Sequence, residues 1–280
     1  MPRVAAPPVS IIIPACNEAG WIGACLQAVV ASRRIAGEVI VVANGCTDDT
    51  AERARAFGQP LADAGLALKV IETPALGKPG ALDAGDLEAR QGIRVYLDAD
   101  VIVSPPLLGQ IARALADPAP RLASGSPQVA PARSRVTRAY ARFWTRLPFV
   151  TRGCPAFGLY AVNAAGRARW GRFPQIISDD TFVRLSFAPH ERRRLESGYS
   201  WPMAEGFGAL VRVRRRQDQG VAEFDRLYPH LRGNDDKLKP DRRFLIDRLR
   251  RDPLAFLVYA AVTLAVRLGW GAQSGWVRGR

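Results

Sequence analysis

Two aspartates one residue apart follow an apolar stretch near the middle of the chain. Residues 95 to 103 have the sequence V-Y-L-D-A-D-V-I-V, with Asp98 and Asp100 at its centre. In extended backbone, side chains two residues apart leave the same face, so both carboxylates would point to one place. Such a pair suits a hard divalent cation and the phosphates that the cation carries. The other interpretation of an isolated pair is an Asp-rich turn after a strand.

A second acidic pair, Asp179 and Asp180, follows Ser178 and precedes an apolar-periodic stretch from Thr181 to Phe187. This order places both acids at a helix N-terminus, where negative charge is favoured. Adjacent acids can raise one another's pKa, which suits a general base. Ser-Asp-Asp is also an ordinary capping sequence, so a purely structural role would explain it too.

Strands and helices are predicted to alternate in the first hundred residues. We predict strands over residues 9–13, 38–42, 68–72 and 94–97, and helices over residues 18–32, 50–58 and 81–90. This order predicts an α/β fold with an open, mostly parallel central sheet flanked by helices. In the second half we predict helices over residues 107–115, 134–145 and 181–187, and a strand over residues 159–162.

Polar residues collect where the predicted strands end. Asn17 and Glu18 follow the first strand, Asn44 follows the second, and Asp98 follows the fourth. Ligands of such sheets bind beyond the carboxyl ends of the strands, so this pattern is typical of a nucleotide site. For Glu18, first-turn helix capping is the alternative. No G-x-G-x-x-G or G-x-x-x-x-G-K-[ST] sequence occurs, which argues against a dinucleotide-binding dehydrogenase and a P-loop NTPase.

The composition indicates a basic globular protein. The 280 residues, 48% of them hydrophobic, suffice for one large domain with a tail, and a net charge of +14 comes almost entirely from arginine. This charge favours anionic partners, although arginine-rich codon usage gives the same composition. The four cysteines lack C-x-x-C spacing, so we expect neither a zinc site nor a disulfide framework. The N-terminus lacks the features of a signal peptide, which predicts a cytoplasmic location.

The composition of the chain changes past Gly220. Residues Leu231 to Pro240 are polar and predict a linker. A basic stretch from Arg242 then leads into Leu254 to Val266, thirteen residues without charge. This is short of the roughly 20 residues that span a bilayer. The stretch is therefore a marginal span, an interfacial helix with a basic flank, or a helix buried on the domain.

Five blocks in the first 220 or so residues resemble, in order, the motifs of family 2 glycosyltransferases, which are inverting enzymes of the GT-A fold. The blocks are V-S-I-I-I-P-A-C-N-E-A, V-I-V-V-A-N-G-C-T-D-D-T, G-K-P-G-A-L-D-A-G, Y-L-D-A-D and I-I-S-D-D-T-F-V. They are similar to two nucleotide-binding turns, the G-K-x-x-A-L-N-x-G helix, the metal-binding D-x-D and the acidic base motif. The resemblance implies a Rossmann-like GT-A domain over residues 1–225. Residues 226–280 would form a linker and a basic, apolar helical tail, for which membrane association is a further prediction.

The resemblance also implies roles for individual residues. Asp100 would bind Mg²⁺ or Mn²⁺ at the donor diphosphate, and Asp98 would contact the ribose or a metal-bound water. Asp180, with Asp179 beside it, would be the catalytic base. The other predicted donor-binding residues are Pro14, Asn17, Glu18, Asn44, Lys78 and Arg215. For Lys78 the alternative is a solvated lysine, and for Arg215, with its neighbours Arg212, Arg214 and Arg216, a solvated helix face.

The implied reaction is the transfer of a sugar from a nucleotide-sugar donor to a hydroxyl acceptor. A UDP-sugar is the first expectation for the donor and a GDP-sugar the second. Ala43-Asn44 replaces an aspartate usual in the second block, and V-R-R-R-Q from Val213 lacks the tryptophan of Q-x-x-R-W, which argues against a processive polysaccharide synthase. A lipid-linked or cell-envelope acceptor, and contact with an anionic membrane on its cytoplasmic face, are further predictions. The alternatives are a GT-A-like nucleotidyltransferase and, less favoured, a basic nucleic-acid-binding protein; no nucleic acid is expected, since no aromatic-basic strand motif occurs.

Overall fold

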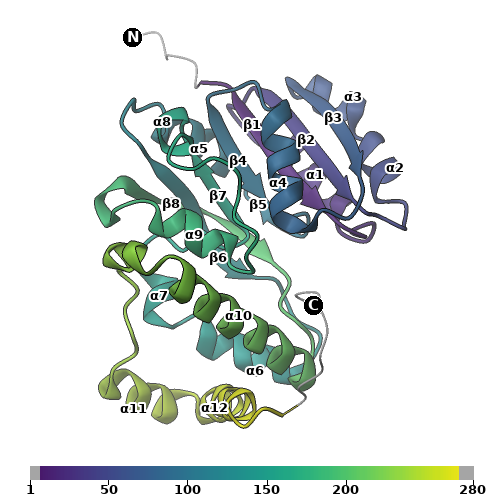
Figure 1. Ribbon diagram of the computed structural model, residues 1–280. Helices are drawn as coiled ribbons and strands as arrows, with labels where there is room; N and C mark the ends of the chain where they lie inside the picture. Colours follow the sequence, from purple (N-terminus) through teal and green to yellow (C-terminus); the bar gives the residue numbers. More distant parts are fainter. Residues whose placement is uncertain (1–6, 271–280) are drawn as a thin grey trace.

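The first strand, β1 (Val9–Ala15), is apolar on both faces because both faces are covered by helices. Ile11 and Ile13 pack into one core cluster and Ile12 into another, as the alternation of side chains along a strand requires. The computed structural model describes residues 7–270, and Figure 1 shows the sheet between its two layers of helices.

Eight strands form one mixed sheet in the order β3-β2-β1-β4-β7-β6-β8-β5. The first four in this order run parallel to one another, β7 is antiparallel to both β4 and β6, β8 is parallel to β6, and β5 is antiparallel to β8. The remaining strands are β2 (Gly37–Asn44), β3 (Leu66–Thr73), β4 (Ile93–Leu97), β5 (Ile102–Val103), β6 (Leu122–Val129), β7 (Leu159–Val162) and β8 (Arg192–Trp201). The predicted α/β fold with a mostly parallel central sheet is confirmed.

The two faces of the sheet carry different helices. One core cluster joins β1 to α1 (Ile22–Val30) and α5 (Leu107–Ala114). The other joins β1 and β2 to α4 (Gly77–Glu88) and α9 (Asp179–Leu185). Shorter helices are α2 (Thr50–Arg55), α3 (Gly58–Asp63), α7 (Pro148–Thr151) and α8 (Ala164–Arg167), with 3-10 turns η1 (Pro189–Glu191) and η2 (Pro229–Asn234). The single helix predicted over residues 50–58 is wrong, because the chain breaks there into α2 and α3.

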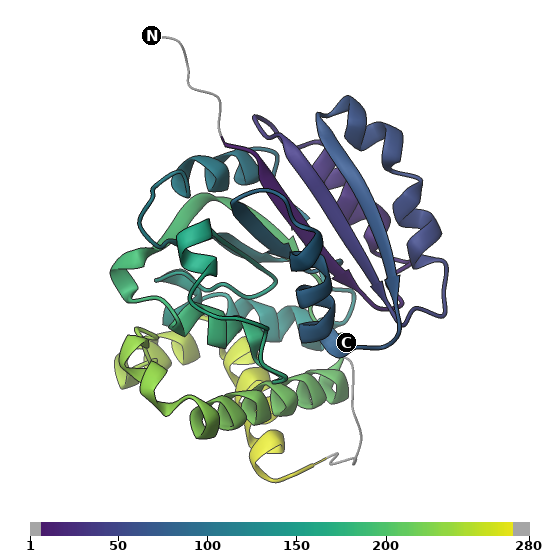
Figure 2. The ribbon, with the colours of Figure 1, turned by 45° about the horizontal axis from the view of Figure 1, so that its top comes forward.

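Four longer helices gather at the end of the molecule away from β3, as Figures 1 and 2 show. They are α6 (Arg135–Trp144), α10 (Phe207–Leu227), α11 (Arg242–Arg251) and α12 (Pro253–Arg267). Val262 and Ala265 of α12 are buried in one cluster with Tyr140 of α6 and Leu210 of α10. Helix α10 runs across the boundary predicted at residue 225, and that boundary stays a prediction.

No helix within residues 7–270 combines the length and the apolar character that crossing a bilayer would need. The marginal span is thereby removed from the three interpretations of the tail. Helix α12 instead buries one face on α6 and α10, while several of its leucines are exposed.

Candidate active site

The predicted site residues lie where the order of the strands reverses. In the sheet, β2 and β3 lie on one side of β1, and β4 lies on the other. Open α/β sheets bind their ligands at such a point, beyond the carboxyl ends of the strands. Asn17 and Glu18 follow β1 and Asp98 follows β4, so residues from distant parts of the sequence share this edge.

Asp98 and Asp100 lie in a turn and not in extended backbone as predicted. Strand β4 ends at Leu97, and the Val101 N–H donates to the Asp98 carbonyl oxygen over 3.0 Å. The Asp-rich turn is thus the observed local structure, and the argument from alternating side chains does not apply. Both acids lie near α1, since burial, and then the charges of Asp100 and Asp98, raise the pKa of the Cys25 thiol in that helix.

Lys78, in the first turn of α4, joins the two acidic motifs. Its ammonium lies 2.9 Å from the Asp98 carboxylate and 3.4 Å from that of Asp179. Burial opposes the charge on Lys78, but Asp179 and Asp98 outweigh burial and raise the pKa of the ammonium. The structure therefore shows a partly exposed, positively charged lysine that pairs with two carboxylates, rather than an unpaired surface lysine.

Asp179 is the buried member of the second acidic pair. Its side chain is only 4% exposed, and the Tyr160 hydroxyl donates to its Oδ2 over 3.3 Å. Burial raises the pKa of Asp179 to about 6; Lys78 lowers it and the neighbouring charge of Asp180 raises it. Asp179 thus supports Lys78 from inside the protein.

Asp180 is more accessible than its neighbour. It is half-buried in the first turn of α9, and its Oδ1 accepts the Thr181 N–H over 2.7 Å. Ser178 makes no side-chain cap to this helix, although it occupies the N-cap position. Of the two acids, Asp180 is the one that a hydroxyl group arriving from solvent can approach.

Asn44 holds the loop that leads into α4. Its Oδ1 accepts the Leu76 N–H over 2.7 Å and its Nδ2 donates to the Gly77 carbonyl over 3.1 Å. The next residue, Gly45, has a φ of +62°, and a Cβ there would lie 2.7 Å from that of Ala75. The amide of Asn44 therefore helps to place Lys78, and its predicted contact with the nucleotide stays a prediction.

The turns after β1 and β2 are bonded to each other. The Oδ1 of Asn17 accepts the Thr47 N–H over 2.6 Å, with Asn17 itself at a φ of +54°. The Glu18 N–H donates to the Thr50 hydroxyl over 2.8 Å. Pro14 lies opposite Val42 of β2 near the end of β1. These residues shape this edge of the sheet, and their predicted contacts with a nucleotide stay predictions.

Helix α10 approaches the second acidic pair at Gly220. A Cβ at this position would lie 2.4 Å from the Ser178 Oγ, so only glycine allows so close a crossing. Arg216 lies one turn earlier on the same face of α10. Arg215 points elsewhere, because its guanidinium donates to the Trp270 carbonyl. Among the described contacts, none joins Arg215 to Lys78 or its two carboxylates.

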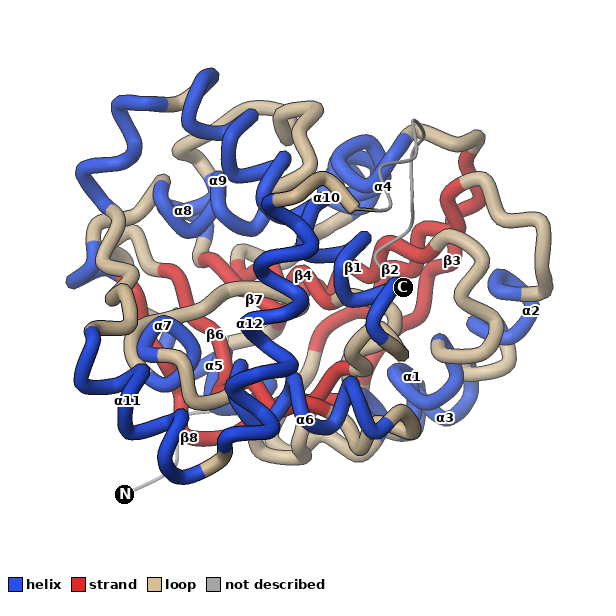
Figure 3. The backbone as a smooth tube through the Cα atoms, turned by 90° about the horizontal axis from the view of Figure 1, so that it is seen from below, coloured by secondary structure: helices blue, strands red, loops and turns tan. Residues whose placement is uncertain are grey.

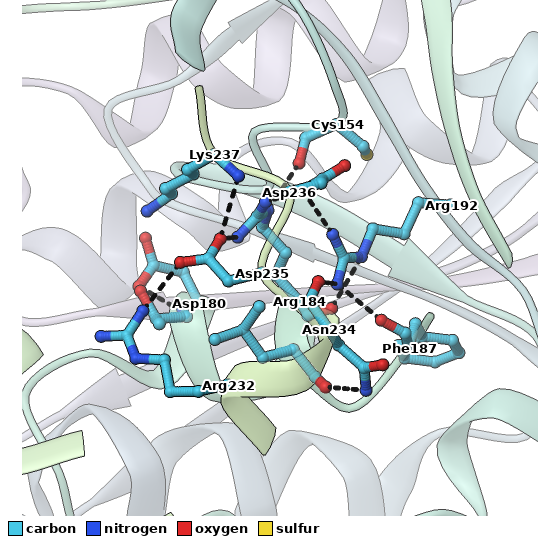
Figure 4. Close-up of polar contacts among 12 residues, drawn as sticks. Cys154, Asp180, Arg184, Phe187, Arg192, Arg232, Asn234, Asp235, Asp236 and Lys237 are labelled. Carbon is cyan, nitrogen blue, oxygen red and sulfur yellow. Dashed lines mark hydrogen bonds and ion pairs between the residues drawn. The ribbon is translucent and has the colours of Figure 1, made fainter. Parts of the chain in front are cut away.

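A buried ionic cluster behind α9, which the sequence analysis missed, is drawn in Figure 4. Arg184 of α9 lies 2.9 Å from Asp235 and also contacts Asp236. Arg192 of β8 lies 2.7 Å from Asp236 and donates to the Asn234 carbonyl over 2.6 Å. Both acids belong to the segment predicted as a linker, which therefore fixes the helix that carries Asp180. Two adjacent acids inside a strongly basic tail were the available signal.

Residues 10–214, most of the chain, match the sequence model described as Glycosyl transferase family 2. The chain belongs to this family. It is thus a glycosyltransferase of class EC 2.4, as predicted. Membership decides against the two alternatives, a nucleotidyltransferase and a non-enzymatic nucleic-acid-binding protein. No curated protein matches the sequence.

This family 2 glycosyltransferase is also similar to solved structures. The mannosyltransferase PcManGT from Pyrobaculum calidifontis, in complex with GDP-Man and Mn²⁺, has a TM-score of 0.57 at 24% identity, covering 98% of this chain and 77% of that one. TarS 1-349 of S. aureus in complex with UDP has a TM-score of 0.54 at 16% identity, covering 98% and 95%. Glucosyl-3-phosphoglycerate synthase from Mycobacterium tuberculosis, with Mn²⁺ and UDP, has a TM-score of 0.55 at 22% identity, covering 83% and 82%. At these identities the likeness shows the fold.

The acidic residues of this glycosyltransferase fit a divalent cation that is shared with a substrate. Mg²⁺ is usually held by one or two carboxylates and completes its shell with water and substrate phosphates. Within residues 7–270, no group of three or more His, Cys, Asp or Glu is placed to hold a metal ion alone. Lys78 engages an oxygen of Asp98, which agrees with Asp100 as the principal ligand. A cation here would need the oxygens of a bound diphosphate.

Proposed function

We propose that this protein is a metal-dependent, inverting glycosyltransferase that moves one sugar from a nucleotide-sugar donor to a hydroxyl acceptor. The observation that carries the proposal is the position of Lys78 between Asp98 and Asp179. This contact joins the turn that would bind the donor phosphates to the helix that carries the candidate base. The proposed donor site and the proposed base would thus lie at the same edge of the sheet.

The donor diphosphate would bind at the ends of β1 and β4. Asp100, with Asp98, would hold Mg²⁺ or Mn²⁺, and the cation would neutralise charge on the leaving diphosphate. Lys78 adds a positive charge beside Asp98. The similar structures with GDP-Man and Mn²⁺, and with UDP, support a nucleotide-sugar donor, for which we propose UDP first and GDP second.

Asp180 is the proposed general base. The acceptor oxygen attacks the anomeric carbon from the face opposite the diphosphate while its proton passes to the Asp180 carboxylate. The new carbon–oxygen bond forms as the bond to the diphosphate oxygen breaks, so the configuration inverts. Asp179 does not meet the acceptor, because its carboxylate is buried against Lys78 and Tyr160. It positions Lys78.

The acceptor is proposed to be a hydroxyl of a lipid-linked or cell-envelope intermediate, glycosylated in the cytoplasm. The exposed leucines of the tail support an apolar acceptor, since they give the protein a surface that suits lipid.

The role of Asp180 is tested by Asp180→Asn. We expect the release of UDP or GDP from UDP-glucose, UDP-GlcNAc or GDP-mannose, with water as acceptor, to fall about 100-fold or more. Binding of the same nucleotide, measured by titration calorimetry, should change less than about twofold, because Asp180 does not contact the phosphates. Loss of nucleotide binding together with activity would instead make Asp180 a structural residue of α9.

A further inference from the structure

One face of α12 presents a regular apolar stripe to solvent. Leu254, Leu257, Leu264 and Leu268 are 57% to 74% exposed, and the exposed Ala261 lies between them. The intervals of three and four residues place these side chains in a stripe about 80° wide and roughly 20 Å long. We call it the leucine stripe. Singly exposed leucines are ordinary, but a continuous apolar row marks a surface that contacts something.

The leucine stripe is separate from the face by which α12 is held in the protein. The adjacent face of the helix buries Ala255 against Phe143, and Val262 and Ala265 against α6 and α10. In Figure 3, seen from below, α12 crosses in front of α6 and α10 as the outermost helix. A partner can therefore approach the stripe without displacing packed side chains.

Positive charge is concentrated on α11, the helix that leads into α12. Helix α11 carries five arginines and a single aspartate, and its Ile246 and Leu249 are also exposed. On the packed side of α12, beside Ala255, a pocket of about 300 Å³ is lined by Arg142, Arg146, Arg248 and Arg251 together with Asp252. Arg142 is bound by Asp252, and Arg251 by Asp247, so two more arginines than acids surround the pocket. Guanidinium groups suit phosphate oxygens.

We propose that the leucine stripe and the arginines of α11 form a docking surface for an anionic lipid bilayer. The leucines would enter the boundary between headgroups and acyl chains, and the arginines would contact lipid phosphates. The protein lies on the bilayer, since no described helix can cross it.

Charge decides against a second copy of the chain as the occupant. A twofold dimer would place the same surface of both molecules together, so the arginines of α11 would face one another. A bilayer that contains anionic lipid offers opposite charge to the same residues. This inference goes beyond the transfer reaction and does not depend on it.

The test is co-sedimentation of the full chain with vesicles of phosphatidylcholine, with and without about one third phosphatidylglycerol, at about 0.15 M salt. We expect binding to the anionic vesicles only. Leu257→Ser combined with Leu264→Ser should reduce the bound fraction at least about tenfold, because both side chains are exposed and serve only the contact. Arg250→Ser should reduce it by about threefold.

Matched controls lie on the other side of the protein. Leu87→Ser removes a leucine that is 87% exposed on α4, and Arg90→Ser removes an exposed arginine, so both should bind like the unchanged protein. No sedimentation with anionic vesicles, or equal binding by the double leucine variant, would overturn the proposal. So would a dimer in light scattering that the leucine changes convert to a monomer. Nucleotide binding measured on each variant separates these outcomes from failure of the proposed transfer function.

Discussion

Lys78 connects the donor end of the site to the base end through two carboxylates. Its replacement in Lys78→Ala would leave Asp179 buried with Tyr160 as its remaining polar contact among those described. The pKa of Asp179 would then rise further, because the nearest positive charge is gone. We expect UDP or GDP to bind about tenfold more weakly in the presence of Mn²⁺, since one cation at the diphosphate is lost. Titration calorimetry measures this change.

The matched control is Lys69→Ala. Lys69 is another of the four lysines, and it pairs with Glu88 on the surface, away from the site. Nucleotide affinity should be unchanged in this variant. Unaltered affinity in Lys78→Ala, or equal weakening in both variants, would contradict the placement of Lys78 at the donor.

Asp179 gives the stability of the protein a specific dependence on pH. Its pKa rises from an ordinary value of 3.8 to about 6 in the folded state, chiefly through burial. Between these values the folded protein binds more protons than the unfolded chain, so this group's contribution to the free energy of unfolding falls as pH rises. In the unchanged protein this group should lower the free energy of unfolding on the order of 2 kcal/mol across this range, and the Asp179→Asn variant should not show this decrease. Urea denaturation at pH about 4 and about 7 measures it; identical pH slopes in both proteins would refute the assignment.

Among the elements, α10 constrains the position of α9 through Gly220. A methyl group at Gly220 would press on Ser178 Oγ and on Ile177, directly before the acidic pair. We expect Gly220→Ala to reduce the rate of donor hydrolysis about tenfold or more, since a displacement of about 1 Å at the base is costly. Overpacking should also cost about 1–3 kcal/mol of stability.

The control for this change lies on the same helix. A Cβ at Gly208 would meet only the end of the Arg212 side chain, at 3.5 Å. Gly208→Ala should therefore keep full activity and match or exceed the stability of the unchanged protein. An active Gly220→Ala enzyme would show that α10 does not set the geometry of Asp180.

Elements with a strong local pattern could be predicted from the sequence, and those without one could not. The strand over residues 159–162 was predicted with its observed bounds, and β1, β2 and β4 were predicted within a few residues, because their buried cores are nearly all apolar. Strand β8 was not predicted, since R-R-R-L-E-S-G-Y-S-W shows no regular alternation and most of its residues are only partly buried. Strand β6 was not predicted either, because it contains Gly125 and Pro127, residue types that are disfavoured inside strands.

The candidate site, too, could be predicted only in part from the sequence. The acids and Lys78 were predictable as residue types in ordered motifs, but the contact of Lys78 with both Asp98 and Asp179 depends on how distant segments fold together. The turn at Asp98 could not be distinguished from a strand end by its sequence. The pairing of Arg184 and Arg192 with Asp235 and Asp236 is likewise long-range: two adjacent acids in a basic tail indicate that they have partners, but local patterns do not show which arginines these are.

Across the whole molecule, this ionic cluster ties the C-terminal part of the chain to the catalytic half. Asp236→Asn would leave Arg184 and Arg192, whose side chains are almost fully buried, with less compensating charge. We expect a loss of about 2 kcal/mol in the free energy of unfolding, because Asp236 itself is partly exposed. Asp218→Asn, which breaks an exposed pair with Arg214, should cost less than about 0.5 kcal/mol. Equal losses in the two variants would deny the cluster a structural role.

The most direct test of the account is a thermal-shift measurement with UDP and GDP, each with Mn²⁺ and with EDTA, on the unchanged protein and on Asp100→Ala. The account predicts that one nucleotide raises the melting temperature by about 5 °C when Mn²⁺ is present, and that Asp100→Ala removes this rise. A rise of the same size in EDTA, or no rise with either nucleotide, would contradict a metal-dependent donor site at Asp98 and Asp100.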